Sequence, residues 1–153
     1  MTDTSESRVT RSYTMTIRAA CYRVFPMLCP VREHDYLENW RADVLFSESG
    51  VAEPGCVFQT PNDVGAPSTW YIAEHDPETG RILFVVFTPG SRVSRLDVTV
   101  SAKGADAAAV TLTYTHTAIA PPGRDFVAAF TEDAFTAKMT NFESKLNECL
   151  ART

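Results

Sequence analysis

The apolar residues of this chain recur at two different spacings, and the change between them constrains the fold more than any other feature. In most runs between residues 9 and 118 they alternate with polar residues, which is the period of a strand with one buried face. After Pro121 they recur every three or four positions, which is the period of an amphipathic helix. The chain is therefore expected to form a sheet first and then a helix that covers it.

Turn-forming residues divide the first part of the chain into short strands. The strand-like runs are residues 9–17, 40–49, 56–60, 69–75, 81–88, 91–102 and 110–118. Between the first two runs, Pro26 and Pro30 exclude one long helix and favour two short ones, because proline cannot donate a backbone hydrogen bond. Hairpin-length connections favour antiparallel pairing. We therefore predict an α+β fold, with a curved antiparallel sheet of about six or seven strands wrapped around a long helix at residues 125–151.

Length and charge narrow the class of protein. A chain of 153 residues suits one domain, which we expect at residues 8–153 after a flexible tail at residues 1–7. The net charge of -5 argues against a general nucleic-acid binder. No run of basic residues would bind an anionic membrane, and no apolar run is long enough for membrane insertion.

The N-terminus and the cysteines indicate a compartment. The first ten residues, MTDTSESRVT, lack the apolar region of a signal peptide, so we expect a cytoplasmic protein. The four cysteines form no CxxC pair and are expected to be reduced, small and buried. His34, His75 and His116 have no metal-ligand spacing, so neither a metal nor another cofactor is expected. His75 adjoins a turn and is expected to be solvated.

The last strand-like run contains two polar aromatic residues on an apolar face. In TLTYTHTAIA, threonine occupies every second position from Thr111 to Thr117, and this face is expected to be wet. The opposite face carries Tyr114 and His116 among aliphatic residues. Three interpretations remain open: the pair is buried and bonded to protein or water, it orients a ligand, or it acts as general base and acid.

Other residues are candidates for a ligand-binding wall. The run at residues 40–49 is expected to place four residues on one face, namely Trp40, Ala42, Val44 and Phe46. In the run at residues 69–75 the period allows either face inward, and we choose the one with Trp70 and Ile72. Phe84 belongs to a run that is apolar on both faces. Each of these aromatic residues is equally suited to plain core packing.

The C-terminal stripe and a charged cluster supply the remaining candidates. The stripe consists of Ala128, Thr131, Phe135, Met139, Phe142, Leu146 and Leu150. Phe135 and Met139 face the expected sheet, and Thr131 is the one polar residue in mid-stripe, placed to touch a ligand or cavity water. His34 lies in the cluster Arg32–Asp35, which is either an entrance that orients a polar ligand head or a solvated, salt-bridged helix end.

Three stretches resemble a known superfamily. CPVREHDYLENW (29–40), SESGVAEPGCVF (47–58) and YTHTAIA (114–120) are similar to the SRPBCC superfamily, the START/Bet v 1-like or helix-grip group, and within it to a bacterial branch of polyketide cyclase/dehydrase-like proteins of unknown function. The resemblance implies a deep apolar cavity between sheet and helix. It implies no universal set of catalytic residues, because members bind lipids, hormones or polyketides, assist chaperones or cyclise substrates.

The leading functional hypothesis is binding of a small, largely apolar molecule, lipid-like or polyketide-like and aromatic, in this cavity. The first alternative is a cyclase or dehydratase with His116 as base and Tyr114 as acid. The second is a co-chaperone-like interaction module, which predicts an exposed apolar patch. A homodimer is possible under each hypothesis. The predicted ligand-binding residues are Tyr114, His116, Trp40, Trp70, Phe84, Thr131, Phe135, Met139 and His34.

Overall fold

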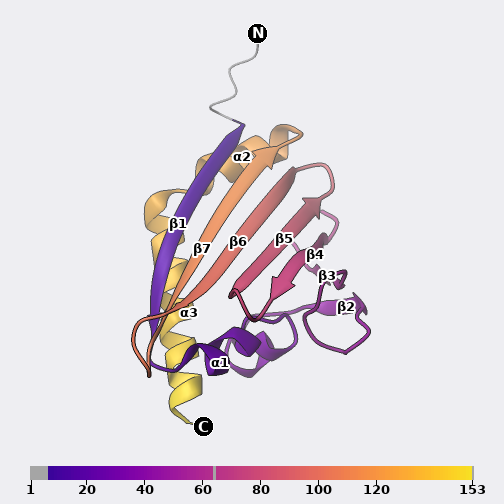
Figure 1. The fold of residues 1–153 in the computed structure, drawn as a ribbon. Coiled ribbons are helices and arrows are strands. Elements are labelled where there is room, and N and C mark those ends of the chain that lie inside the picture. Colours follow the sequence, from indigo (N-terminus) through magenta and orange to yellow (C-terminus); the bar gives the residue numbers. More distant parts are fainter. Residues whose placement is uncertain (1–6, 64, 153) are drawn as a thin grey trace.

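The computed structural model describes residues 7–63 and 65–152, in which a seven-stranded antiparallel sheet curves around the C-terminal helix (Figure 1). The strand order is β1-β7-β6-β5-β4-β3-β2. The strands are β1 (Arg8–Ile17), β2 (Asp43–Phe46), β3 (Val57–Thr60), β4 (Ser68–Asp76), β5 (Arg81–Thr88), β6 (Arg92–Ala102) and β7 (Ala108–Ala118). The predicted α+β helix-grip arrangement is confirmed. Of the expected tail, residues 1–6 lie outside the described residues, and Ser7 accepts a hydrogen bond from the Ala118 amide at 2.7 Å.

The helices lie at the start of the chain and at its end. The short ones are α1 (Cys21–Val24) and the 3-10 turns η1 (Phe25–Met27) and η2 (Arg32–Asp35), and the later ones are α2 (Pro121–Ala129) and α3 (Glu132–Ala151). In Figure 1, α3 runs behind β1 and β7, and α2 lies at the far end of the sheet. Within the described part of the chain, no helix is both long and apolar enough to cross a bilayer.

The C-terminal helix differs from the prediction in its start and its continuity. We expected one helix at residues 125–151, but α2 begins at Pro121, which fits the first turn of a helix because its missing N–H needs no partner there. The helix then breaks before Thr131, whose extended backbone and Oγ1, 3.2 Å from the Ala134 amide, form the N-cap of α3. Thr131 is therefore a capping residue rather than a member of the buried stripe. Phe135 and Met139 are buried as expected.

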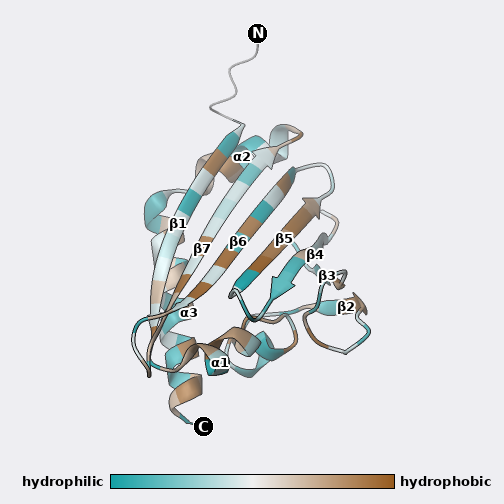
Figure 2. Ribbon diagram, in the orientation of Figure 1, coloured by the Kyte–Doolittle hydropathy of each residue, from teal (hydrophilic) through white to brown (hydrophobic). Residues whose placement is uncertain are grey.

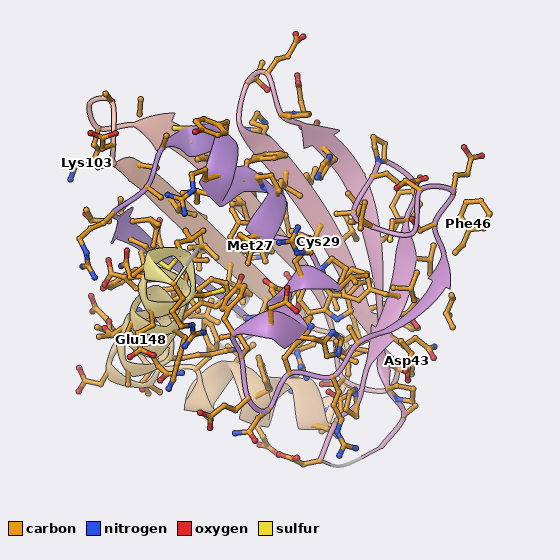
Figure 3. The ribbon with its side chains drawn as sticks, turned by 90° about the horizontal axis from the view of Figure 1, so that it is seen from below. Met27, Cys29, Asp43, Phe46, Lys103 and Glu148 are labelled. Carbon is orange, nitrogen blue, oxygen red and sulfur yellow. The ribbon has the colours of Figure 1, made fainter. Side chains whose placement is uncertain are left out.

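The strand expected at residues 40–49 is shorter, and its side chains do not share one face. Only Asp43–Phe46 form β2. A register shift places Val44 opposite Phe58 and Phe46 opposite Val57, so these two side chains lie on opposite faces of the sheet. Seen from below, Figure 3 shows Phe46 pointing away from the molecule at the sheet edge, whereas Met27 and Cys29 lie inside.

A second register shift changes the faces of β4. Trp70 and Ile72 point inward as chosen, and Tyr71 is about half exposed on the outside. The shift between Ile72 and Glu74 then brings His75 opposite Ile82. The His75 ring packs against Phe25 with a centroid distance of 4.9 Å, and burial lowers its pKa. His75 is therefore partly buried rather than fully solvated.

The threonine face of β7 is on the outside, as predicted. It pairs with β1 through a ladder of hydroxyl groups at 2.9–3.2 Å, formed by Thr10–Thr115, Ser12–Thr113 and Thr14–Thr111. Figure 2 shows these two strands paler and more teal than the brown β5, from which β6 separates them. Because the ladder keeps the hydroxyl groups outward, the alternate residues of β7 face the helix side, where the site lies.

Candidate functional site

A cavity of about 340 Å³ lies between the inner face of β3–β7, the helices α2 and α3, and the segment around η2. This volume is within the range of small-molecule sites. Eight aromatic side chains contribute to its wall, namely Trp40, Phe58, Trp70, Phe84, Tyr114, Phe126, Phe130 and Phe142. The sheet therefore does not close onto the helix with a solid hydrocarbon core along its whole length.

One cross-strand row of the sheet forms the floor of the cavity. Antiparallel pairing places Phe58, Trp70, Val86, Ser94 and His116 side by side on successive strands. Trp70 and His116 are three strand spacings apart, roughly 14 Å between their backbones. The cavity thus has an indole-rich end at β3–β4 and an imidazole-containing end at β6–β7.

The indole-rich end presents flat apolar surfaces. The Trp70 ring stacks on Phe58 at 5.2 Å and meets Trp40 edge-on at 6.4 Å. The indole N–H of Trp70 donates to Thr60 Oγ1 at 2.9 Å, and that of Trp40 donates to the Pro30 carbonyl at 2.8 Å. Because both polar atoms have protein partners, the exposed ring surfaces can accept an apolar or aromatic group without leaving a donor unpaired.

The opposite end is built around His116. Its Nδ1 lies 2.6 Å from Ser94 Oγ, the residue opposite it on β6. The ring is perpendicular to both Phe126 and Phe130, with centroids at 4.9 and 4.5 Å, and its Nε2 is buried without a hydrogen-bond partner among the described residues. Burial, followed by the charges of Arg92 and Lys138, lowers the pKa of His116 to about 4, so the imidazole is neutral near pH 7.

Tyr114 and His116 are neighbours that stack rather than bond. Their ring centroids are 5.7 Å apart with an interplanar angle of 24°. Burial raises the pKa of the Tyr114 hydroxyl above its usual range. A phenol that is harder to ionise and an imidazole that is harder to protonate are both poorly tuned for proton transfer near neutral pH. The pair can contact a ligand, but its geometry does not favour an acid/base couple.

Four charged side chains also line the cavity. They are Glu33 of η2, Arg41 of the segment before β2, Arg92 of β6 and Lys138 of α3, and Arg41 is exposed. Burial raises the pKa of Glu33 to about 8 and lowers the pKa of both Arg92 and Lys138.

Each of the two interpretations of the charged cluster at residues 32–35, a solvated helix end and a cavity entrance, fits part of it. Arg32 and Asp35 form an exposed ion pair at 3.3 Å, as expected of a solvated helix end. Glu33 instead lines the cavity. The cluster therefore contributes one carboxyl group to the interior, and its other charges remain at the surface.

The structure brings most of the predicted ligand-binding residues together. Six line the cavity: Trp40, Trp70, Phe84, Tyr114, His116 and Met139. Phe135 is buried behind the wall, in edge contact with Tyr114 at 5.7 Å. His34 is exposed, with Nδ1 at 3.2 Å from the Val31 carbonyl, and lies at an adjoining surface depression. Together with the capping residue Thr131, these two lie outside the cavity wall. Residues 7–63 and 65–152 contain no group of three metal-ligating side chains.

The polar residues that were not anticipated carried signals in the sequence. Extending the inward row of β6 back from Leu96 by the two-residue period reaches Ser94 and Arg92. On α3, Lys138 is three residues after Phe135 and four before Phe142, which places it on the same face as the stripe.

No protein-family model and no curated protein matches the chain. Several solved structures do match it. Norcoclaurine synthase from Thalictrum flavum, in complex with dopamine and hydroxybenzaldehyde, has a TM-score of 0.68 at 10% identity, covering 95% of this chain and 87% of that one. The Zhui aromatase/cyclase from Streptomyces sp. R1128 has a TM-score of 0.68 at 16% identity, covering 95% of each chain.

A third match is Ara h 8.0201, with a TM-score of 0.62 at 14% identity, covering 94% of this chain and 99% of that chain. At these identities the likeness concerns the fold alone. It agrees with the element order, the seven-stranded sheet and the long C-terminal helix described above. The chain therefore has the helix-grip fold of the Bet v 1-like, or SRPBCC, proteins.

Proposed function

We propose that this protein binds a small, largely aromatic molecule in the cavity between sheet and helices. The observation that carries the proposal is the wall itself: eight aromatic side chains surround about 340 Å³, and both indole N–H groups are already bonded within the protein. Stacked and edge-on rings at 5–6.5 Å are the arrangement that a further aromatic ring extends favourably.

The choice of an aromatic ligand over a long lipid chain rests on the shape of this wall. Flat ring faces dominate the indole-rich end, whereas a lipid chain would be served equally well by aliphatic side chains. Among the proteins with this fold, one structure holds dopamine and hydroxybenzaldehyde and another is an aromatase/cyclase. These ligands and activities belong to those proteins, and they support an aromatic ligand for this cavity by analogy of fold.

The surroundings of His116 and Tyr114 favour a role in ligand binding over a role in catalysis. His116 is held by Ser94 through one nitrogen, its other nitrogen is buried, and its ring packs against Phe126 and Phe130. A general base needs its free nitrogen within reach of the proton that it removes. The described arrangement gives these two residues a role in shaping the cavity.

A second candidate function has one observation in its favour. The outer face of the sheet exposes Phe46, Tyr71, Val85, Phe87 and Val93 by 38–56%. Such a patch is the feature that an interaction module requires, and it lies on the face opposite the cavity. Co-purification from extract of the wild-type protein, compared with a Phe87→Lys variant, tests this function independently of the cavity.

The ligand-binding proposal is tested by tryptophan fluorescence. Trp40 and Trp70 are the two tryptophans of the chain, and both line the cavity. Titration with acetylnaphthalene, an uncharged bicyclic probe, is expected to quench them saturably. Val86→Phe adds a ring on the inner face and should weaken binding about tenfold or more, whereas Val85→Phe adds it on the outer face and should not.

Equal binding by the two valine variants, or quenching without saturation, would contradict the proposal. Native mass spectrometry of protein purified from its own host provides the complementary measurement. We expect a bound molecule of low mass that contains an aromatic ring system. Extraction then gives its identity.

A further inference from the structure

Arg92 lies at the imidazole-containing end of the cavity without a counter-ion. Its guanidinium carbon is 3.4 Å from the centroid of the Phe126 ring, and its Nη1 donates to Ser91 Oγ at 3.1 Å. Its Nε is buried and has no hydrogen-bond acceptor among the described residues. No carboxylate of residues 7–63 and 65–152 forms an ion pair with Arg92.

Lys138, an exposed residue of α3, adds a second cation to the lining of the same cavity. Its Nζ is 5.8 Å from the centroid of the Tyr114 ring, and it forms neither a hydrogen bond nor an ion pair within residues 7–63 and 65–152. The positive charge of Arg92 helps to lower the pKa of both Lys138 and His116, which places the three basic groups around one region of the cavity.

The acidic group of the cavity does not neutralise these cations near pH 7. Glu33 lies beyond ion-pair distance of Lys138, and because burial raises its pKa to about 8, its carboxyl group is mostly protonated in neutral solution. Two cations elsewhere on the same elements have carboxylate partners: Arg95 of β6 pairs with Asp97 at 2.8 Å, and Lys145 of α3 pairs with Glu38 at 3.6 Å. Arg92 and Lys138, by contrast, leave the cavity lining with more positive than negative charge.

Arg92, with its Nε buried, is an uncompensated charge partly removed from water, which is costly unless a partner of opposite charge accompanies it. We propose that the ligand itself supplies this partner: an aromatic molecule with an anionic oxygen group, a carboxylate or an ionised enol or phenol, which lies between Arg92 and Lys138 while its rings contact Trp40 and Trp70. This inference rests on the proposed ligand-binding function and names the chemistry of one end of the ligand. Arginine is well suited to such an oxygen pair because its donors form a planar fork.

Two probes with the same ring system test the inference. Naphthoate and acetylnaphthalene have nearly equal size, but only naphthoate carries a carboxylate. The wild-type protein near neutral pH is expected to bind naphthoate about tenfold or more tightly than acetylnaphthalene. Arg92→Gln and Lys138→Gln should each remove most of this preference and leave the affinity for acetylnaphthalene within about twofold, since hydrogen bonds to charged groups contribute more than neutral contacts.

The chain offers matched controls for both substitutions. Arg95→Gln removes an exposed arginine from the same strand, and Lys145→Gln removes a surface-paired lysine from the same helix. Both should retain the preference for naphthoate. Because Arg92 also packs on Phe126, its glutamine variant could lose stability, and Arg92→Lys and Lys138→Arg are therefore included. Both keep the charge, so each should retain a measurable preference for naphthoate. They provide the comparison where a glutamine variant does not fold.

The outcomes separate this inference from the function on which it rests. If the wild-type protein binds the two probes equally well, the anion site is refuted and the aromatic cavity stands. If naphthoate binds more tightly but the glutamine variants retain the full preference, as the controls do, the anion binds elsewhere and the inference is again wrong. If neither probe binds, both proposals fail together.

Discussion

Replacing Glu33 with glutamine is expected to change how the stability of the protein depends on pH. In the folded protein burial raises the pKa of Glu33 from 4.5 to about 8, and the Lys138 charge opposes this only in part. Between these two values the unfolded chain releases the proton while the folded protein keeps it. The free energy of unfolding therefore falls as the pH rises through this window, and the stabilising contribution is complete only below the lower value.

The size of the effect follows from the shift. One pKa unit corresponds to about 1.4 kcal/mol, so the interval from 4.5 to about 8 corresponds to a loss of roughly 5 kcal/mol in the free energy of unfolding. This figure is an upper limit, because Glu33 keeps some contact with solvent. Glutamine has nearly the same shape as a protonated carboxyl group and does not titrate. The Glu33→Gln variant should therefore lose none of this stability.

Urea denaturation between about pH 5 and about pH 8 measures the difference. The groups that act on Glu33 or respond to it, Lys138, Tyr36 and Tyr114, are present in both proteins, so their own titrations largely cancel. Glu78→Gln, at an exposed turn, serves as the control and should follow the wild type. The advantage of Glu33→Gln over the wild type should grow by about 1 kcal/mol per pH unit. Parallel curves would show that the carboxyl group ionises normally in the folded state and would refute the reasoning.

Two further substitutions test the opposite end of the cavity. His116→Gln should make the stability less sensitive to acid. The pKa of His116 is lowered from 6.5 to about 4, so the free energy of unfolding of the wild type falls by roughly 3 kcal/mol as the pH falls through that window. Urea denaturation measures this loss, and an equal loss in both proteins would contradict the prediction. Gly123→Ala should destabilise by about 2 kcal/mol or more, because the added Cβ would overlap the Ser91 carbonyl oxygen and displace α2. Calorimetry measures the second effect, and an unchanged melting temperature would show that α2 moves freely on the sheet.

Side-chain direction within one element follows from the sequence alone. In a strand, alternation places Tyr114 and His116 on the face opposite the threonines, and in a helix the spacing of Phe135 and Met139 defines the buried stripe. Both are properties of the local backbone, so no long-range information is needed. The order of the elements then suffices for the α+β arrangement. The break before Thr131 was also readable, since a threonine followed by two acidic residues is typical of a helix start.

Register shifts depend on the partner strand. The shifts after Val44 and after Ile72 turn Phe46 outward and His75 inward, because an extra residue in one strand of a pair reverses the faces that follow it. The two-residue period of a single strand does not predict its register with the partner strand. The exposed apolar residues of β2 and the contact of His75 with Phe25 therefore required the assembled sheet.

The chemistry of the cavity was decided by tertiary structure for the same reason. Glu33, Arg92 and Lys138 are far apart in the sequence and ordinary in type, and only the curvature of the sheet around α3 brings them to one enclosed space. Burial then moves the pKa of Glu33 and of the two cations toward their uncharged forms, which no pattern of residues encodes. The sequence determined which faces are apolar, and the fold determined which charges those faces enclose.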